Sequence, residues 1–117
     1  MSDDKNTRRA RRREVTEQIP VTDVMAEAVI GRLGNVSETG MLMIASVPMN
    51  DDALFQFRFA ISGAGGLSVP LDVGAHLLLH EESNAPGQYW TGFRFLTLSR
   101  DHRELLKAWV EQETSAT

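Results

Sequence analysis

The stretch "LFQFRFAISGAGGLSV", which spans 54–69, indicates the kind of secondary structure that dominates this protein. Large apolar side chains recur in it at every second position, namely Phe55, Phe57, Phe59 and Ile61. A period of two places such side chains on one face of a β-strand. The "GAGG" segment at 63–66 then predicts a hairpin turn, because glycine adopts positive φ angles at no steric cost.

Apolar runs on both sides of this hairpin predict further strands. The run "MLMIASV" at 41–47 is typical of a buried strand. The residues after the glycine turn continue the hairpin as one strand or two, and Pro70 marks an edge or a break there. After a second turn, "ESNAPG" at 82–87, the segment "QYWTGFRFLTL" predicts a last strand. One face of this strand carries Phe93 and Phe95.

Near the C-terminus the spacing of apolar residues changes to a helical period. One apolar stripe contains Leu105, Leu106, Trp109 and Val110. Ser99 is a good N-cap, and Asp101 lies in the first turn, where it interacts favourably with the helix dipole. These features predict an amphipathic helix over 99–112 that closes an antiparallel sheet or barrel.

The segment "EVTEQIPVTDVMAEAVIGRLG" at 14–34 permits two interpretations. Thr22 can cap a helix that ends at Gly34. The apolar face of that helix would consist of Val21, Val24, Met25, Ala28 and Val29. The same residues can instead form two short strands broken near 26–27. Periodicity alone slightly favours the helix.

The composition is that of a single globular domain. The 117 residues are 42% apolar and 24% charged, which is ordinary for a soluble protein. The lack of cysteine excludes a disulfide framework, a zinc–thiolate site and a cysteine nucleophile, and it fits a reducing compartment. We find no signal peptide and no apolar run near the ~18 residues of a membrane span, so we expect a cytoplasmic protein.

Basic residues are concentrated at the N-terminus of a chain whose net charge is −4. Six of the twelve basic side chains lie in the first thirteen positions: Lys5, Arg8, Arg9, Arg11, Arg12 and Arg13. The overall acidity argues against a broad nucleic-acid surface. Arginine offers a planar fork of donors and stacks on aromatic faces, which suits a small ligand with phosphates and flat bases. A solvated basic tail is the alternative interpretation.

A second short segment, "NVSETG" at 35–40, consists by itself of ordinary turn residues. Together the two segments resemble the motifs of the PilZ domain, a bacterial receptor module for cyclic di-GMP. The family pattern is Arg-x-x-x-Arg, followed after twenty-odd residues by (Asp or Asn)-x-Ser-x-x-Gly. The first motif can be Arg8 with Arg12 or Arg9 with Arg13. The second motif corresponds to Asn35, Ser37 and Gly40.

The resemblance extends over about 8–112, because an apolar strand follows Gly40 and a Gly-apolar-x-Phe strand from Gly92 leads into the closing helix. It implies a mainly β fold, a six-stranded antiparallel β-barrel with a C-terminal α-helix, and therefore strands rather than a helix in 20–34. The implied organisation is that of a stand-alone PilZ protein. Its parts are a disordered N-terminus at 1–7, a flexible arginine arm at 8–14, a barrel at 15–98, the closing helix at 99–112 and a disordered tail at 113–117.

The resemblance also implies how cyclic di-GMP would be held. The arm arginines would pair with phosphates and stack on a guanine; they are Arg8, Arg9, Arg12 and Arg13, with Arg11 as a possible addition. Asn35 and Ser37 would take the polar edge of a guanine, and Gly40 would leave room for it. Asn35 replaces the more frequent Asp, so we expect a weaker guanine contact. His80 is a possible further contact, although an exposed strand histidine is the simpler interpretation.

The remaining aromatic and histidine residues do not indicate catalysis. Trp90 and Trp109 are expected to lie in the core. His76 and His80 would lie about 13 Å apart in a strand, too far to share a metal ion, and His102 is expected on an exposed helix face. We find no nucleophile elbow, phosphate-binding loop or dinucleotide fingerprint. We therefore predict a non-enzymatic receptor that needs no cofactor or metal.

Such a receptor would relay binding of the messenger to an unidentified protein partner by a conformational change. Two alternatives stay open. The protein can be a PilZ-type adaptor that has lost its ligand, or it can use its basic tail to bind nucleic acid or an anionic membrane.

Overall fold

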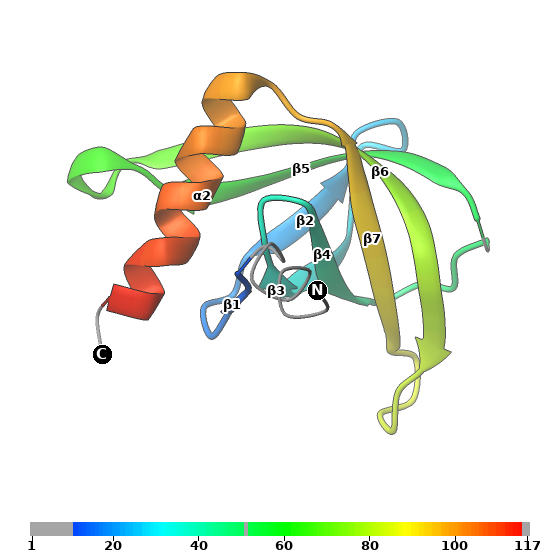
Figure 1. Ribbon diagram of the computed structural model, residues 1–117. Coiled ribbons are helices and arrows are strands. Elements are labelled where there is room, and N and C mark those ends of the chain that lie inside the picture. The colour runs from blue at the N-terminus through cyan, green and yellow to red at the C-terminus, as the bar shows by residue number, and fades with distance from the viewer. Residues whose placement is uncertain (1–10, 51, 116–117) are drawn as a thin grey trace, which may run out of the picture.

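The computed structural model describes residues 11–50 and 52–115, which form seven strands and a C-terminal helix (Figure 1). The elements are β1 (Arg13–Glu14), β2 (Pro20–Asp23), β3 (Ala28–Val36), β4 (Gly40–Ala45), β5 (Leu54–Ser62), the 3₁₀ turn η1 (Ala64–Gly66), β6 (Ser68–Glu82), β7 (Tyr89–Thr97) and α2 (Arg100–Ser115). The predicted disorder of 1–7 lies outside the described residues.

The strands form a closed antiparallel barrel. Their order is β1-β3-β2-β5-β6-β7-β4, and an additional pairing between β3 and β4 closes the sheet on itself. The six strands β2–β7 make up the barrel, while β1 pairs with the end of β3 beside β2. The predicted six-stranded barrel with a C-terminal helix is confirmed.

The segment at 20–34 consists of two strands, so the helical interpretation of its periodicity is wrong. A turn separates β2 from β3, and the Asp23 carboxylate accepts hydrogen bonds from the backbone N–H groups of Met25 (3.0 Å) and Ala26 (3.2 Å). Glu27 has a φ of 54°, which no α-helix contains. This local capping of the turn overrides the weak helical pattern.

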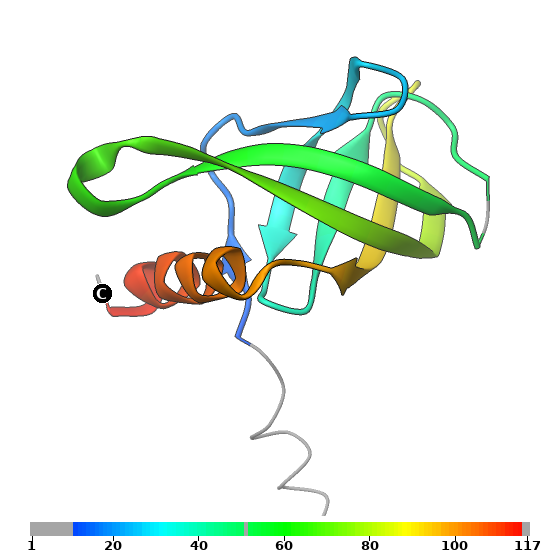
Figure 2. The same ribbon diagram turned by 90° about the horizontal axis from the view of Figure 1, so that it is seen from above.

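The β5–β6 hairpin follows the alternation that the sequence shows. Phe57, Phe59 and Ile61 are buried, and the turn uses positive φ angles at Gly65 and Gly66. Pro70 pairs with β5 alone, since pairing of β6 with β7 begins at Gly74; the edge interpretation is therefore confirmed. Figure 2 shows this hairpin reaching past the rest of the barrel, alongside α2.

Helix α2 packs its apolar stripe against the barrel, with Leu106, Trp109 and Val110 buried. Ser99 caps it as predicted, because its Oγ accepts the His102 N–H at 3.1 Å. The helix continues to Ser115, past its expected end at 112, because no glycine or proline interrupts it. Within the described part of the chain, no helix is long and apolar enough to span a bilayer.

The two tryptophans differ in their environment. Trp109 is 2% exposed and belongs to the core, as predicted. The prediction that Trp90 is also a core residue is wrong, since Trp90 is 38% exposed on the outer face of β7. The inward positions of β7 are Thr91, Phe93 and Phe95, and the strand period places Trp90 on the opposite face.

Candidate functional site

The arginine segment and the strand that carries Asn35 lie side by side. In the β1–β3 ladder Glu14 faces Asn35 and Arg13 faces Val36. The exposed guanidinium of Arg12 donates a hydrogen bond from Nη1 to Asn35 Oδ1 at 2.7 Å, across 23 positions of sequence. The structure therefore brings together the described end of the first motif and the first residue of the second.

Asn35, on β3, belongs to a row of outward positions that crosses four strands. It faces Leu42 of β4, Leu42 faces Gly92 of β7, and Gly92 faces Leu79 of β6. Leu42 points outward because its neighbours Met41 and Met43 are buried. Since Gly92 has no side chain, the row forms a largely apolar strip, here called the floor, beside the polar Arg12–Asn35 pair. A flat ring system fits such a floor.

Ser37 lies in the turn between β3 and β4, two residues after Asn35, and its side chain points inward. It is 1% exposed, and its Oγ accepts the Thr39 N–H at 3.1 Å and lies 3.0 Å from Thr39 Oγ1. Its backbone N–H donates to the Gly40 carbonyl at 2.8 Å. In this conformation Ser37 shapes the β3–β4 turn, and its hydroxyl contacts the loop rather than the outer face.

Gly40 has a reason to be glycine that lies within the barrel itself. A Cβ atom added there would collide with the Phe93 carbonyl oxygen of β7. Next to it, the Thr39 carbonyl accepts the Phe95 N–H at 2.8 Å. The close approach of β4 to β7 therefore excludes a side chain at this position, whether or not a ligand lies above it.

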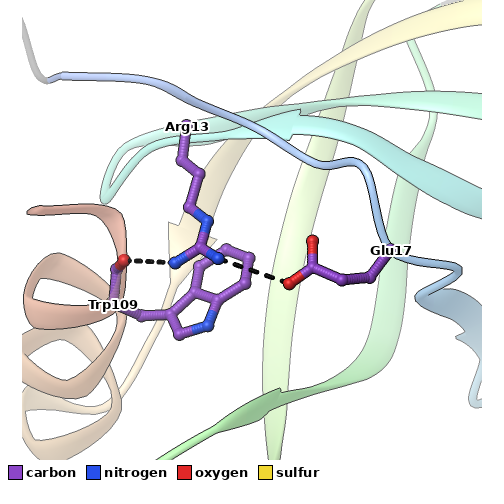
Figure 3. A network of polar contacts seen from close by, with 3 residues as sticks. All are labelled: Arg13, Glu17 and Trp109. Carbon is purple, nitrogen blue, oxygen red and sulfur yellow. Dashed lines mark hydrogen bonds and ion pairs between the residues drawn. The ribbon is translucent and has the colours of Figure 1, made fainter. Parts of the chain in front are cut away.

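Arg13 points toward α2, where its guanidinium lies over the indole of Trp109 (Figure 3). Its guanidinium lies 3.6 Å from the ring centroid of Trp109, and its Nη1 donates to the Trp109 carbonyl at 2.7 Å. Its Nη2 lies 3.3 Å from Glu17 Oε2. The buried Nε has no hydrogen-bond partner among the described residues. Arg13 thus connects β1 to the closing helix through a cation–π contact and a charge-assisted hydrogen bond.

The other predicted site residues are distributed differently. Arg8 and Arg9 lie outside the described residues, and Arg11 is exposed. His80 stacks on Tyr89, with ring centroids 5.3 Å apart, and its Nε2 lies 3.5 Å from the Met49 backbone nitrogen. No group of three or more His, Asp or Glu side chains within 11–50 and 52–115 is placed to hold a metal ion.

Sequence reasoning missed two outward residues near this floor. Arg94 and Trp90 flank Gly92 on β7, and both point outward. A signal for them was present, since inward Phe93 and Phe95 place Arg94 on the opposite face by the strand period, and Trp90 as well.

This chain belongs to the PilZ domain family, because its sequence matches the family model over residues 6–112. No curated protein sequence matches the chain.

Two solved structures have a similar fold. One is the Bacillus subtilis inhibitor of motility MotI/DgrA, with a TM-score of 0.74 and 8% identity; the match covers 94% of this chain and 52% of that one. The chain thus spans about half the length of that protein. The other is the PilZ domain of YcgR from Escherichia coli with c-di-GMP, with a TM-score of 0.63 and 19% identity, covering 93% of each chain. At these identities the likeness shows the fold alone.

Proposed function

We propose that this protein is a receptor for cyclic di-GMP that binds the messenger on the outer face of β3, β4 and β7. The observation that carries the proposal is the Arg12–Asn35 hydrogen bond, because it unites the two motif segments at one place on the surface. Membership of the PilZ family and the similar fold of the YcgR domain with c-di-GMP support it.

Arg12 and Asn35 have complementary tasks in this proposal. The Arg12 guanidinium is exposed and can turn from Asn35 to a phosphate oxygen, where a charge-assisted hydrogen bond is stronger than its present one. The released Asn35 Oδ1 then accepts a donor from the Watson–Crick edge of a guanine. Arg8, Arg9 and Arg11 would supply further cationic donors from the arm.

Ser37 and Gly40 take supporting tasks. Ser37 holds the turn that orients Asn35, since its hydroxyl and backbone bind Thr39 and Gly40. Gly40 keeps β4 against β7, which positions Leu42 and Gly92 in one row. Both residues thus act on the shape of the site, and a direct contact of Ser37 with the ligand would require the turn to open.

The opposite directions of Arg12 and Arg13 suggest how binding is relayed. Arg12 faces the ligand, while the adjacent Arg13 holds α2 through Trp109. A rearrangement of the arm around the ligand would strain or release the Arg13–Trp109 contact and change the surface that α2 presents to a protein partner. This assignment favours the register in which Arg8 and Arg12 form the ligand motif.

Isothermal titration with cyclic di-GMP tests the proposal. The wild type should bind. Arg12→Ala should weaken binding roughly tenfold or more, as expected for loss of a hydrogen bond to a charged phosphate, and Asn35→Ala roughly 2- to 10-fold, as expected for loss of a neutral hydrogen bond. Arg100→Ala is the matched control, because Arg100 is exposed at the start of α2, where its only described ion pair is with Glu104. Absence of binding by the wild type would refute the receptor function and leave an adaptor role.

A basic-tail protein predicts a different pattern. Its binding would fall steeply with salt for any polyanion and would be indifferent to Asn35→Ala. Titrations at two salt concentrations with both proteins therefore separate the two functions.

A further inference from the structure

A concave feature lies on the outer face of β3 and β4, next to the proposed ligand site. It is a groove of about 370 Å³, open to solvent, with walls from β3, β4 and the segments that precede β2 and β7. The residues that matter for its chemistry are Gln18, Arg32, Ile44 and Gln88. Its size is within the range of small-molecule sites.

The groove is continuous with the surface at Asn35. Arg32 and Asn35 are three positions apart on β3, which corresponds to about 10 Å. Between them Gly34 presents no side chain, and a Cβ atom added there would lie 3.7 Å from Ile44 Cδ1. The path from Asn35 to the groove is therefore a flat strip of backbone and Ile44, with no side chain of β3 rising between them.

The groove contains an uncommitted cation over an apolar base. Arg32 is half-buried, and its guanidinium makes no hydrogen bond or ion pair with any residue that the structure describes. Ile44 forms the apolar part of the floor, and Trp90 faces Ile44 across the β4–β7 ladder. The amides of Gln18 and Gln88 add donors and acceptors at the rim. This combination suits a flat, polar-edged ring.

Among nucleobases, the combination favours guanine. Guanine presents two acceptors, O6 and N7, that match the two donors of an arginine fork, whereas adenine replaces O6 with a donor. An arginine without a partner therefore discriminates between these purines, and the apolar floor accepts the face of either one.

We infer that the groove binds the second guanine of the cyclic di-GMP molecule whose first guanine lies at Asn35. The inference rests on the proposed function and extends it: one extended ligand binds per chain, and Arg32 selects guanine at its far end. Trp90, at the edge of the same surface, lies where it can contact this base.

The test compares cyclic di-GMP with the cyclic GMP–AMP that has the same 3′,5′ linkages, in which one guanine is replaced by adenine. In isothermal titrations the wild type should bind one cyclic di-GMP per chain and prefer it over the mixed dinucleotide at least fivefold. Arg32→Met keeps the aliphatic stem but removes the donors. It should bind cyclic di-GMP roughly 5- to 150-fold more weakly, as loss of a bidentate guanine contact predicts, and lose the preference.

Two further variants make the test specific. Arg32→Lys keeps the charge without the fork, so it should lose most of the preference while retaining more affinity than Arg32→Met. Arg58→Met is the matched control. Arg58 is an exposed arginine on β5 that pairs with Asp72 of β6, and β5 lies on the opposite side of the barrel from β4. It should bind both ligands like the wild type.

The outcomes separate this inference from the proposed function. If Arg12→Ala and Asn35→Ala lose binding but Arg32→Met keeps wild-type affinity and preference, the groove is not a guanine site and the receptor function stands. Two ligands bound per chain would also overturn the inference. If the wild type binds neither dinucleotide, both fall together.

Discussion

Replacing Arg13 with alanine tests whether this arginine fastens the closing helix to the barrel. The variant loses a cation–π contact at 3.6 Å, worth about 0.5–2 kcal/mol, and a charge-assisted hydrogen bond to the Trp109 carbonyl, worth about 1.5–3 kcal/mol. The pair with half-exposed Glu17 adds at most about 1 kcal/mol. The substitution also removes the buried Nε. Because this group has no hydrogen-bond partner among the described residues, its removal offsets about 1–3 kcal/mol of the lost stability.

The balance predicts a net loss of about 1–3 kcal/mol in the free energy of unfolding. For a chain of 117 residues this lowers Tm by about 4–12 °C. Thermal unfolding followed by circular dichroism measures the shift. Arg12→Ala is the control, since Arg12 is exposed and its only described contact is Asn35; its Tm should stay within about 2 °C of the wild type. Equal Tm values for the two variants would refute the structural assignment of Arg13.

Three other substitutions follow from the same contacts. Gly40→Ala should fold poorly or melt many degrees lower, because its Cβ would collide with the Phe93 carbonyl; a normal melting curve would show that β4 and β7 can separate there. Ser37→Ala should lose about 1–2 kcal/mol in denaturant unfolding, since it leaves the Thr39 N–H without its acceptor; an unchanged midpoint would contradict this. In Trp109→Phe protein Trp90 is the remaining indole, and cyclic di-GMP should quench its emission; constant emission would place the ligand elsewhere.

Much of the fold could be predicted because the inward pattern of several strands is strict. The alternation of Phe57, Phe59 and Ile61 identified a strand whose inward face is buried in the structure. The turn before β3 is harder to predict from the sequence. Its backbone N–H groups are capped by one carboxylate, that of Asp23, and a single residue leaves no pattern spread over many positions. Short strands joined by a polar turn leave a periodicity that a helix can share.

The residue types of the candidate site could be predicted from the sequence, but the register of β1 against β3 could not. The sequence indicated that the arginines and Asn35 belong together, yet it could not say which arginine faces Asn35. That choice depends on the pairing of β1 with β3, in which Arg13 faces Val36, Glu14 faces Asn35 and the Val15 N–H donates to the Gly34 carbonyl. Such long-range register leaves no local signature in a run of five arginines.

The groove at Arg32 could not be predicted from the sequence for a related reason. Arg32, Ile44 and Gln88 come from different parts of the chain, and only closure of the barrel places them around one cavity. Gly34, which opens the path to Asn35, was interpreted as a possible helix stop. On a strand, its effect depends on the atoms of the neighbouring strand that it faces, which here are the Leu42 carbonyl oxygen and the Ile44 side chain.

Arg13, the first residue of β1, and Arg12, which directly precedes it, would also connect the stability of the helix to the affinity of the proposed site. Strand β1 is held to β3 by only two paired positions, so it is among the elements that rearrange most easily. If the ligand draws the arm away from Trp109, part of its binding energy is used to break the Arg13 contact. Arg13→Ala removes that cost, so it should bind cyclic di-GMP at least as tightly as the wild type and up to roughly 150-fold more tightly. Weaker binding would instead assign Arg13 to the ligand, restore the register of Arg9 with Arg13, and require a different route from the site to α2.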